Sequence, residues 1–170
     1  MSFSQSLLPE FDMEMQKTRK ILERVPDDKM DYQPHPKSMS LARLATHVAE
    51  LPTWTGPTVD LEVLEIPDDF KPHIAGSRAE LLETFDKAVA EARPKIESTS
   101  DEQWQKMWSL KFGGNIVFSA PKATVMRSVI MSHLIHHRAQ LGVYLRLNDV
   151  AIPGMYGPSA DEMNFAPAAS

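Results

Sequence analysis

The amino-acid sequence predicts an all-α protein, a four-helix bundle with long loops that forms one domain over residues 1–170. Four stretches place apolar residues three or four positions apart, the spacing that keeps them on one buried helix face. A pattern typical of β-strands occurs in one short stretch, which is too short for a main sheet. A chain of 170 residues can also bury a core of ordinary size.

The first two helices are separated by an irregular loop that contains several prolines. The first helix is expected at about residues 5–25, where apolar side chains recur along one face, and Pro26 ends it. The second helix is expected to begin near Ser40. Pro52 and Pro57 should kink or fray its far end, because proline removes a backbone donor and clashes with the preceding turn.

A long connection over residues 65–76, which contains two prolines, leads to the third helix. Ser77 is expected to cap this helix, with Glu80 reaching back to the cap in a capping box. The apolar face continues to Ile96, and a short helical turn is expected around Trp104.

A small β-hairpin is predicted between the third and fourth helices. Strand-like residues lie on both sides of Gly113–Asn115, and the hairpin should cover one end of the bundle. The fourth helix is expected from near Pro121, a favourable first-turn residue, to about Asn148. The C-terminal tail, residues 151–170, is rich in proline and glycine and is expected to form an ordered loop.

Composition excludes several classes of function. The chain has no cysteine, so disulfides, thiolate metal sites and a cysteine nucleophile are absent. A net charge of -5 without a Lys/Arg cluster argues against a nucleic-acid binder. No apolar run approaches the ~18 residues that a membrane helix requires. The N-terminus lacks the pattern of a secretory signal, so the sequence favours the cytoplasm.

Histidines on two predicted helices form the candidate functional site. On a helical wheel His133 and His137 lie in the middle of the apolar face of the fourth helix, one turn apart. His47 occupies the corresponding place on the second helix, so three imidazoles would converge if these helices are neighbours. His136 falls on the flank, and Arg138 is expected to point to solvent. Three neutral imidazoles leave an open position on zinc, as catalytic sites do.

Several polar and aromatic residues could support these histidines in a metal site. Without a metal, some of them could instead be the hydrogen-bond partners of the histidines. Gln140, Tyr144 and Glu50 could satisfy buried histidines by hydrogen bonds alone. Glu50 could instead orient an imidazole, bind the ion or act as a catalytic base. Trp54 and Tyr144 could line a pocket or belong to the core. His136 could be a surface residue or a neighbour of the ligands.

The chemistry open to such a site is limited by what the sequence lacks. A zinc protease of the H-E-x-x-H type has Glu after its first histidine, where this chain has Leu134. Hydrolysis would need a separate base, for which Glu50 is the candidate. Activation of a small thiol needs less, because a bound metal itself favours the thiolate. Since the protein has no cysteine, that thiol would arrive as a cosubstrate.

At these residues the chain resembles the DinB-like (damage-inducible) metalloprotein superfamily. The resemblance rests on His47 within LATHVAEL, on HLIHHRAQ and on the tail sequence IPGMYGPSADE, and it extends over nearly the whole chain. Many members carry H-x-x-H-H-R-G-Q, and Ala139 replaces the glycine here. The resemblance places the metal ligands on His47, His133 and His137, while His136 matches a histidine that is not normally a ligand.

The resemblance also implies an antiparallel four-helix bundle, often a homodimer, that binds a divalent ion such as zinc or nickel. Some relatives use the site to transfer low-molecular-weight thiols or to isomerise a small-molecule substrate with their help. The leading hypothesis is therefore a metal-dependent thiol S-transferase. Alternatives are a metal-dependent hydrolase, a non-catalytic metal-binding stress-response protein in which the ion ties two helices together, and an interaction module without metal.

Overall fold

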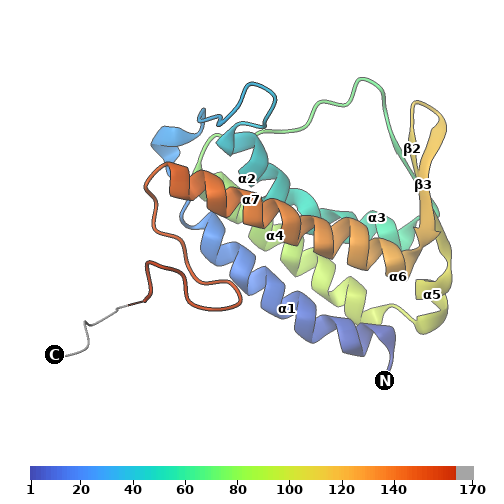
Figure 1. The fold of residues 1–170 in the computed structure, drawn as a ribbon. Helices are drawn as coiled ribbons and strands as arrows, with labels where there is room; N and C mark the ends of the chain where they lie inside the picture. The colour runs from blue at the N-terminus through green and yellow to red at the C-terminus, as the bar shows by residue number, and fades with distance from the viewer. Residues whose placement is uncertain (164–170) are drawn as a thin grey trace.

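The computed structural model describes residues 1–163, and within them the chain is mostly helical with a three-stranded sheet at one end (Figure 1). The helices are α1 (Phe3–Leu22), α2 (Leu41–Glu50), α3 (Thr55–Asp60), α4 (Arg78–Ser98), α5 (Asp101–Gln105), α6 (Lys122–Val125) and α7 (His133–Leu147). Short 3-10 turns cover Asp27–Lys29 and Leu51–Trp54, and a π-helical stretch covers Met126–Ser132. The strands are β1 (Val63–Ile66), β2 (Met107–Phe112) and β3 (Asn115–Pro121).

Two of the predicted helices are divided into shorter elements. Pro52 is the second residue of a 3-10 turn that follows α2 directly, and α3 continues beyond it to Asp60. The predicted fourth helix is helical from Lys122 to Leu147, but its π-helical stretch separates α6 from α7. Proline explains the first division, because it cannot donate the backbone hydrogen bond that an α-helix requires.

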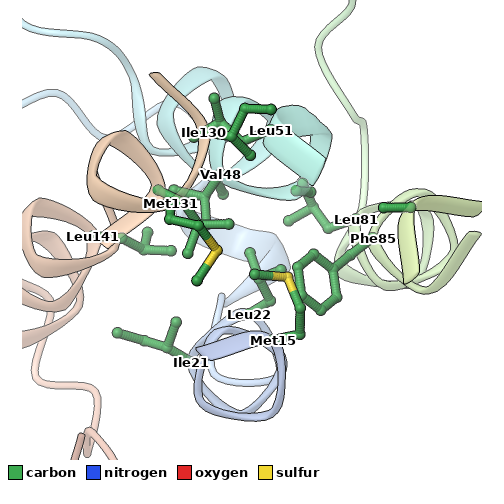
Figure 2. Packing of buried hydrophobic residues seen from close by; sticks show 14 of the residues in the cluster. Met15, Ile21, Leu22, Val48, Leu51, Leu81, Phe85, Ile130, Met131 and Leu141 are labelled. Carbon is green, nitrogen blue, oxygen red and sulfur yellow. The ribbon is translucent and has the colours of Figure 1, made fainter. Parts of the chain in front are cut away.

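The core lies between α1, α2, α4 and α7, whose apolar faces meet in one cluster (Figure 2). Leu22, Val48, Phe85 and Leu141 come from the four helices, and each is almost fully buried. Burial of each such side chain stabilises the fold by about 1.5–3 kcal/mol. α2 contacts α7 directly. The two helices that carry the predicted ligands are therefore neighbours, as convergence of the three histidines requires.

Serine residues cap the N-termini of α2 and α4. Ser40 and Ser77 accept hydrogen bonds from backbone N–H groups in the first turns of α2 and α4, and the cap at Ser77 was predicted. The Glu80 part of the predicted capping box is wrong. Its carboxylate accepts from the N–H of Gly76 at 2.8 Å, because the chain enters the helix with Gly76 closer to that carboxylate. Glu80 also contacts His73 at 2.7 Å.

The sheet combines a hairpin with one strand that the sequence did not reveal. β2 and β3 pair antiparallel, and Gly113 and Gly114 join them with φ of 53° and 79°. Positive φ at both turn residues suits the right-handed twist of the strands. β1 pairs parallel to β2, although part of β1 lies in the stretch predicted as a loop. Four residues are too few for a periodic pattern, and their partner strand is more than forty positions away.

The tail after α7 is irregular and is held to the helices by side chains. Asp161 accepts hydrogen bonds from Arg146 and from the N–H of Ile152, and Glu162 accepts from the N–H of Gly154. The predicted tail extends to residue 170, and positions 164–170 lie outside the described residues. Across residues 1–163 no helix has both the length and the apolar character that crossing a membrane demands.

Candidate metal centre

Three histidines from two neighbouring helices meet at one point. His47 lies on α2, and His133 and His137 lie one turn apart on α7. The Nε2 atom of His133 lies 3.3 Å from Nε2 of His47 and 2.8 Å from Nε2 of His137. Each residue therefore offers a nitrogen within 4.8 Å of the other two. The structure brings together the three residues predicted as ligands.

The other ring nitrogen of each histidine has an oxygen partner. Nδ1 of His133 lies 3.2 Å from the carbonyl oxygen of Val129, which can only accept a hydrogen bond. Nδ1 of His47 lies 3.0 Å from Oε1 of Glu50, and Nδ1 of His137 lies 2.7 Å from Oε1 of Gln140. These contacts place the ring protons on Nδ1, so the Nε2 lone pairs face one another.

Several lone pairs that point at one position can bind a cation. The same arrangement is unfavourable in a core that is held by hydrogen bonds alone. Two Nε2 atoms without protons cannot bond to each other, and their lone pairs repel. A zinc ion with Zn–N distances of about 2.0–2.1 Å and tetrahedral angles would hold ligand nitrogens ~3.3 Å apart. Two of the three separations, 2.8 and 3.3 Å, are close to that value, and the third is at most 4.8 Å. The residues present therefore fit a divalent ion.

Burial favours the neutral form of His133 and His137. Removal from water lowers the pKa of His133, and the nearby His47 lowers it further, against the carbonyl of Val129, which raises it. Burial likewise lowers the pKa of His137, opposed by the hydrogen bond to Gln140. Metal ions bind the neutral form of imidazole. Because burial favours this form, less free energy is needed to remove a proton when an ion binds.

A local departure from α-helical geometry lies beside the centre. Val129, the partner of His133, belongs to the π-helical stretch Met126–Ser132 that ends where α7 begins. π-Helical turns are rare and are frequently found at functional sites. Sequence periodicity did not identify Val129, because a backbone carbonyl carries no residue-type signal. Its position four residues before His133 is the available clue.

The carboxylate of Glu50 is shared between two partners. Oε1 accepts from His47 and lies 3.3 Å from the guanidinium of Arg43. Of the three roles considered for Glu50, this geometry matches the orienting one. Arg43 was not among the predicted site residues, although it lies seven positions before Glu50 on the same helix face.

The two remaining neighbours of His137 occupy different positions. Gln140 contacts its ring directly. His136 is exposed and its ring centroid lies 5.0 Å from that of His137, but it is not part of the converging group. Its predicted place on the flank agrees with this arrangement.

Two hollows adjoin the centre, one beside His47 and the other beside His137. The first, about 360 Å³, is lined by His47, Glu50 and Trp54 together with residues from β1 and the segment after it. The second, about 390 Å³, is lined by His137, Gln140 and Tyr144 together with residues 37–39. The hydroxyl of Tyr144 donates to the carbonyl of Met39 at 3.2 Å. Trp54 and Tyr144 thus line separate hollows, and both also pack against the core.

The prediction that Arg138 points to solvent is wrong. Its side chain is only 2% exposed and donates to the carboxylate of Glu14 on α1 at 2.6 Å. It also donates to Thr18 and to the hydroxyl of Tyr156 in the tail. The wheel assigned this face of α7 to water, but α1 and the tail cover it.

Comparisons with known proteins agree with this fold. The model of the DinB family matches residues 1–168. A DinB-like protein from Bacillus cereus is 19% identical, with a TM-score of 0.69 over 89% of this chain and 97% of that chain. A DinB-like protein from Bacillus subtilis is 16% identical, with a TM-score of 0.67 over 91% and 99%. No curated protein matches the chain. At these identities the solved structures show the fold alone.

Proposed function

The chain belongs to the DinB family, and from this premise we propose that it is a metal-dependent enzyme that joins a small thiol to an electrophile. The proposed ligands are His47, His133 and His137, which could bind a divalent ion. Zinc and nickel are the ions that the resemblance to the family implies, and imidazole ligands suit both. A homodimer is a further prediction, which sedimentation of the purified protein would test.

The observation that supports the metal is the convergence of the three Nε2 atoms with each Nδ1 atom already engaged. Within residues 1–163 the converging group consists of three histidines. Tetrahedral sites with three protein ligands keep a position for water or substrate, as catalytic zinc sites do. The hollows on either side give that position access to small molecules.

A divalent ion in this place would supply a positive charge that favours the thiolate form of a bound thiol. The chain contributes orientation through Glu50, Gln140 and the carbonyl of Val129, which fix the three rings. In the transfer itself the thiol proton passes to water and the sulfur donates an electron pair to the electrophilic carbon. A sulfur–carbon bond forms, and the leaving group departs with the electron pair of its own bond.

Thiol transfer is favoured over hydrolysis by the environment of Glu50. A hydrolase of this type would need a carboxylate free to take a proton from water. Oε1 of Glu50 is instead shared by His47 and Arg43. The chain has no cysteine, so the thiol must be a second substrate.

Metal content and activity test this function together. Wild-type protein loaded with zinc or nickel and then dialysed should retain about one ion per chain, and His133→Ala should retain less than about 0.1. His136→Ala is the matched control, since this neighbouring histidine lies outside the group and should keep the ion. Chelation should stop thiol conjugation, and zinc or nickel should restore it. Full activity of His133→Ala would exclude the proposal.

A further inference from the structure

We propose that the hollow beside His47 binds the uncharged, aromatic or branched apolar body of the electrophile, an inference that rests on the proposed function. This hollow is continuous with the centre, because His47 and its partner Glu50 belong to its wall. At about 360 Å³ it has the size of a site for a small molecule. An electrophile seated there would lie against His47, one of the three proposed ligands.

The apolar part of the wall comes from segments that the sheet brings to the helices. Leu64 and Ile66 are two residues apart on β1, so their side chains share one face of the strand. Trp54 faces them from the end of the 3-10 turn, and Phe70 follows β1 in the connection to α4. Phe70 is 59% exposed, which leaves an aromatic ring at the rim without burial. An exposed aromatic at the edge of a hollow is a typical ligand contact.

The charges of the hollow select against an anionic ligand. Arg43 is paired with Glu50 at 3.3 Å, so its positive charge is already balanced. Glu65 adds a second carboxylate to the wall. An apolar substrate keeps the pair intact, whereas a carboxylate ligand would have to compete with Glu50 for Arg43. The hollow beside His137 differs, since Lys37 in its wall has no carboxylate among the other lining residues.

Tryptophan fluorescence provides a test that does not depend on activity. Trp104 and Trp108 are fully buried, whereas Trp54 is partly exposed in the hollow. The probe is 1,3-dinitrobenzene, an uncharged aromatic that quenches tryptophan and has no leaving group. Titration of the metal-loaded full-length protein should give saturable quenching. Trp54→Phe should abolish the saturable component, and its persistence in that variant would overturn the proposal.

Variants of the wall separate this hollow from its neighbour. Phe70→Ala should weaken probe binding by about three- to tenfold, the range that loss of one aromatic contact gives. Because Phe70 is exposed, this variant should fold normally. Val143→Ala, in the hollow beside His137, is the matched control and should bind the probe as the wild type does. Equal binding by Phe70→Ala and the wild type would contradict the proposal.

One further variant separates failure of the subsite from failure of the metal function. His137→Ala should lose the ion but retain saturable quenching, because His137 lies outside this hollow. Quenching in a protein that never binds metal would support the subsite and reject the proposed centre. Metal binding without saturable quenching would support the centre and reject the subsite.

Discussion

At the scale of residues, the candidate centre depends on three oxygens that hold three imidazoles. Glu50, Gln140 and the carbonyl of Val129 each contact an Nδ1 atom, and this leaves every Nε2 atom facing the same point. One oxygen belongs to a carboxylate, one to a side-chain amide and one to a backbone carbonyl, so their contributions can be tested separately. A carboxylate adds negative charge as well as orientation, whereas the amide and the carbonyl add orientation alone.

The role of Glu50 can be separated into orientation and proton transfer. Glu50→Gln keeps an acceptor oxygen, so it should retain most of the metal affinity and most of the activity. Glu50→Ala removes the contact to His47 and should weaken metal binding by about 10- to 100-fold, as loss of such a partner does. Competition with a chelator measures the affinities. A fall in rate by orders of magnitude in Glu50→Gln, with the ion still bound, would instead identify Glu50 as the base of a hydrolase.

At the scale of elements, a buried ion pair joins α1, α7 and the tail. Arg138 and Glu14 are each 2% exposed and contact at 2.6 Å, and the hydroxyl of Tyr156 bonds to both. Burial alone would raise the pKa of Glu14, but hydrogen bonds from Arg138 and Tyr156 outweigh it and hold the pKa below its usual value. Since Arg138 follows His137, this cluster fixes the helix that carries two of the proposed ligands.

Removal of Arg138 should therefore destabilise the protein strongly. Arg138→Ala breaks the buried ion pair and leaves the carboxylate of Glu14 with Tyr156 and Lys17 as its partners. Loss of one member of a buried pair typically costs about 3–5 kcal/mol. Arg127→Ala is the matched control, because Arg127 pairs with Glu10 on the surface and such pairs contribute about 0–1 kcal/mol. Urea unfolding of both variants measures the difference. If both variants lost the same free energy of unfolding, the buried pair would contribute no more stability than the surface pair.

The attachment of the tail should depend on pH through Asp161. Hydrogen bonds from Arg146 and from the N–H of Ile152 lower the pKa of Asp161 to about 2. A lowered pKa in the folded state means that the carboxylate stabilises the fold above the unfolded pKa of ~3.9 and loses this effect as the pH falls towards about 2. The stability difference between wild type and Asp161→Asn should be constant above pH ~5 and should shrink below it. Unfolding curves at several pH values test this, and a difference that grows on acidification would contradict it.

At the scale of the whole molecule, the proposed ion would connect two helices that lie far apart in sequence. α2 and α7 already contact each other through apolar side chains, so the ion adds to an existing interface. A ligand that binds only the folded state stabilises it by mass action. The size of this effect depends on the ratio of free metal to the dissociation constant.

Removal of the metal should lower the melting temperature of the wild type. At free metal 100-fold above Kd the stabilisation is about 2.7 kcal/mol. For a domain of this size that corresponds to a shift of roughly 5–11 °C. His136→Ala should show the same shift, and His133→Ala should show none. Calorimetry with and without chelator measures it, and an unchanged wild-type Tm would exclude a strongly bound ion.

The features that the sequence predicted well are those encoded over a few neighbouring residues. The helix start near Ser40, the cap at Ser77 and the shared face of His133 and His137 depend on spacings of one to four positions. Local geometry follows from backbone dihedrals and helical periodicity, so these spacings are sufficient to predict it.

The sequence alone determined that this is a helical protein with two histidines on one face of its last helix. The tertiary structure decided that α2 lies beside α7, which brings His47 to them, and that β1 pairs with β2 to form a wall of the hollow. It also decided that Arg138 is buried, because α1 and the tail cover a face that the wheel left to solvent. The physical reason is the separation in sequence between the residues that determine each feature. A periodic pattern specifies which residues share a face, but only the packing of distant segments specifies what that face meets.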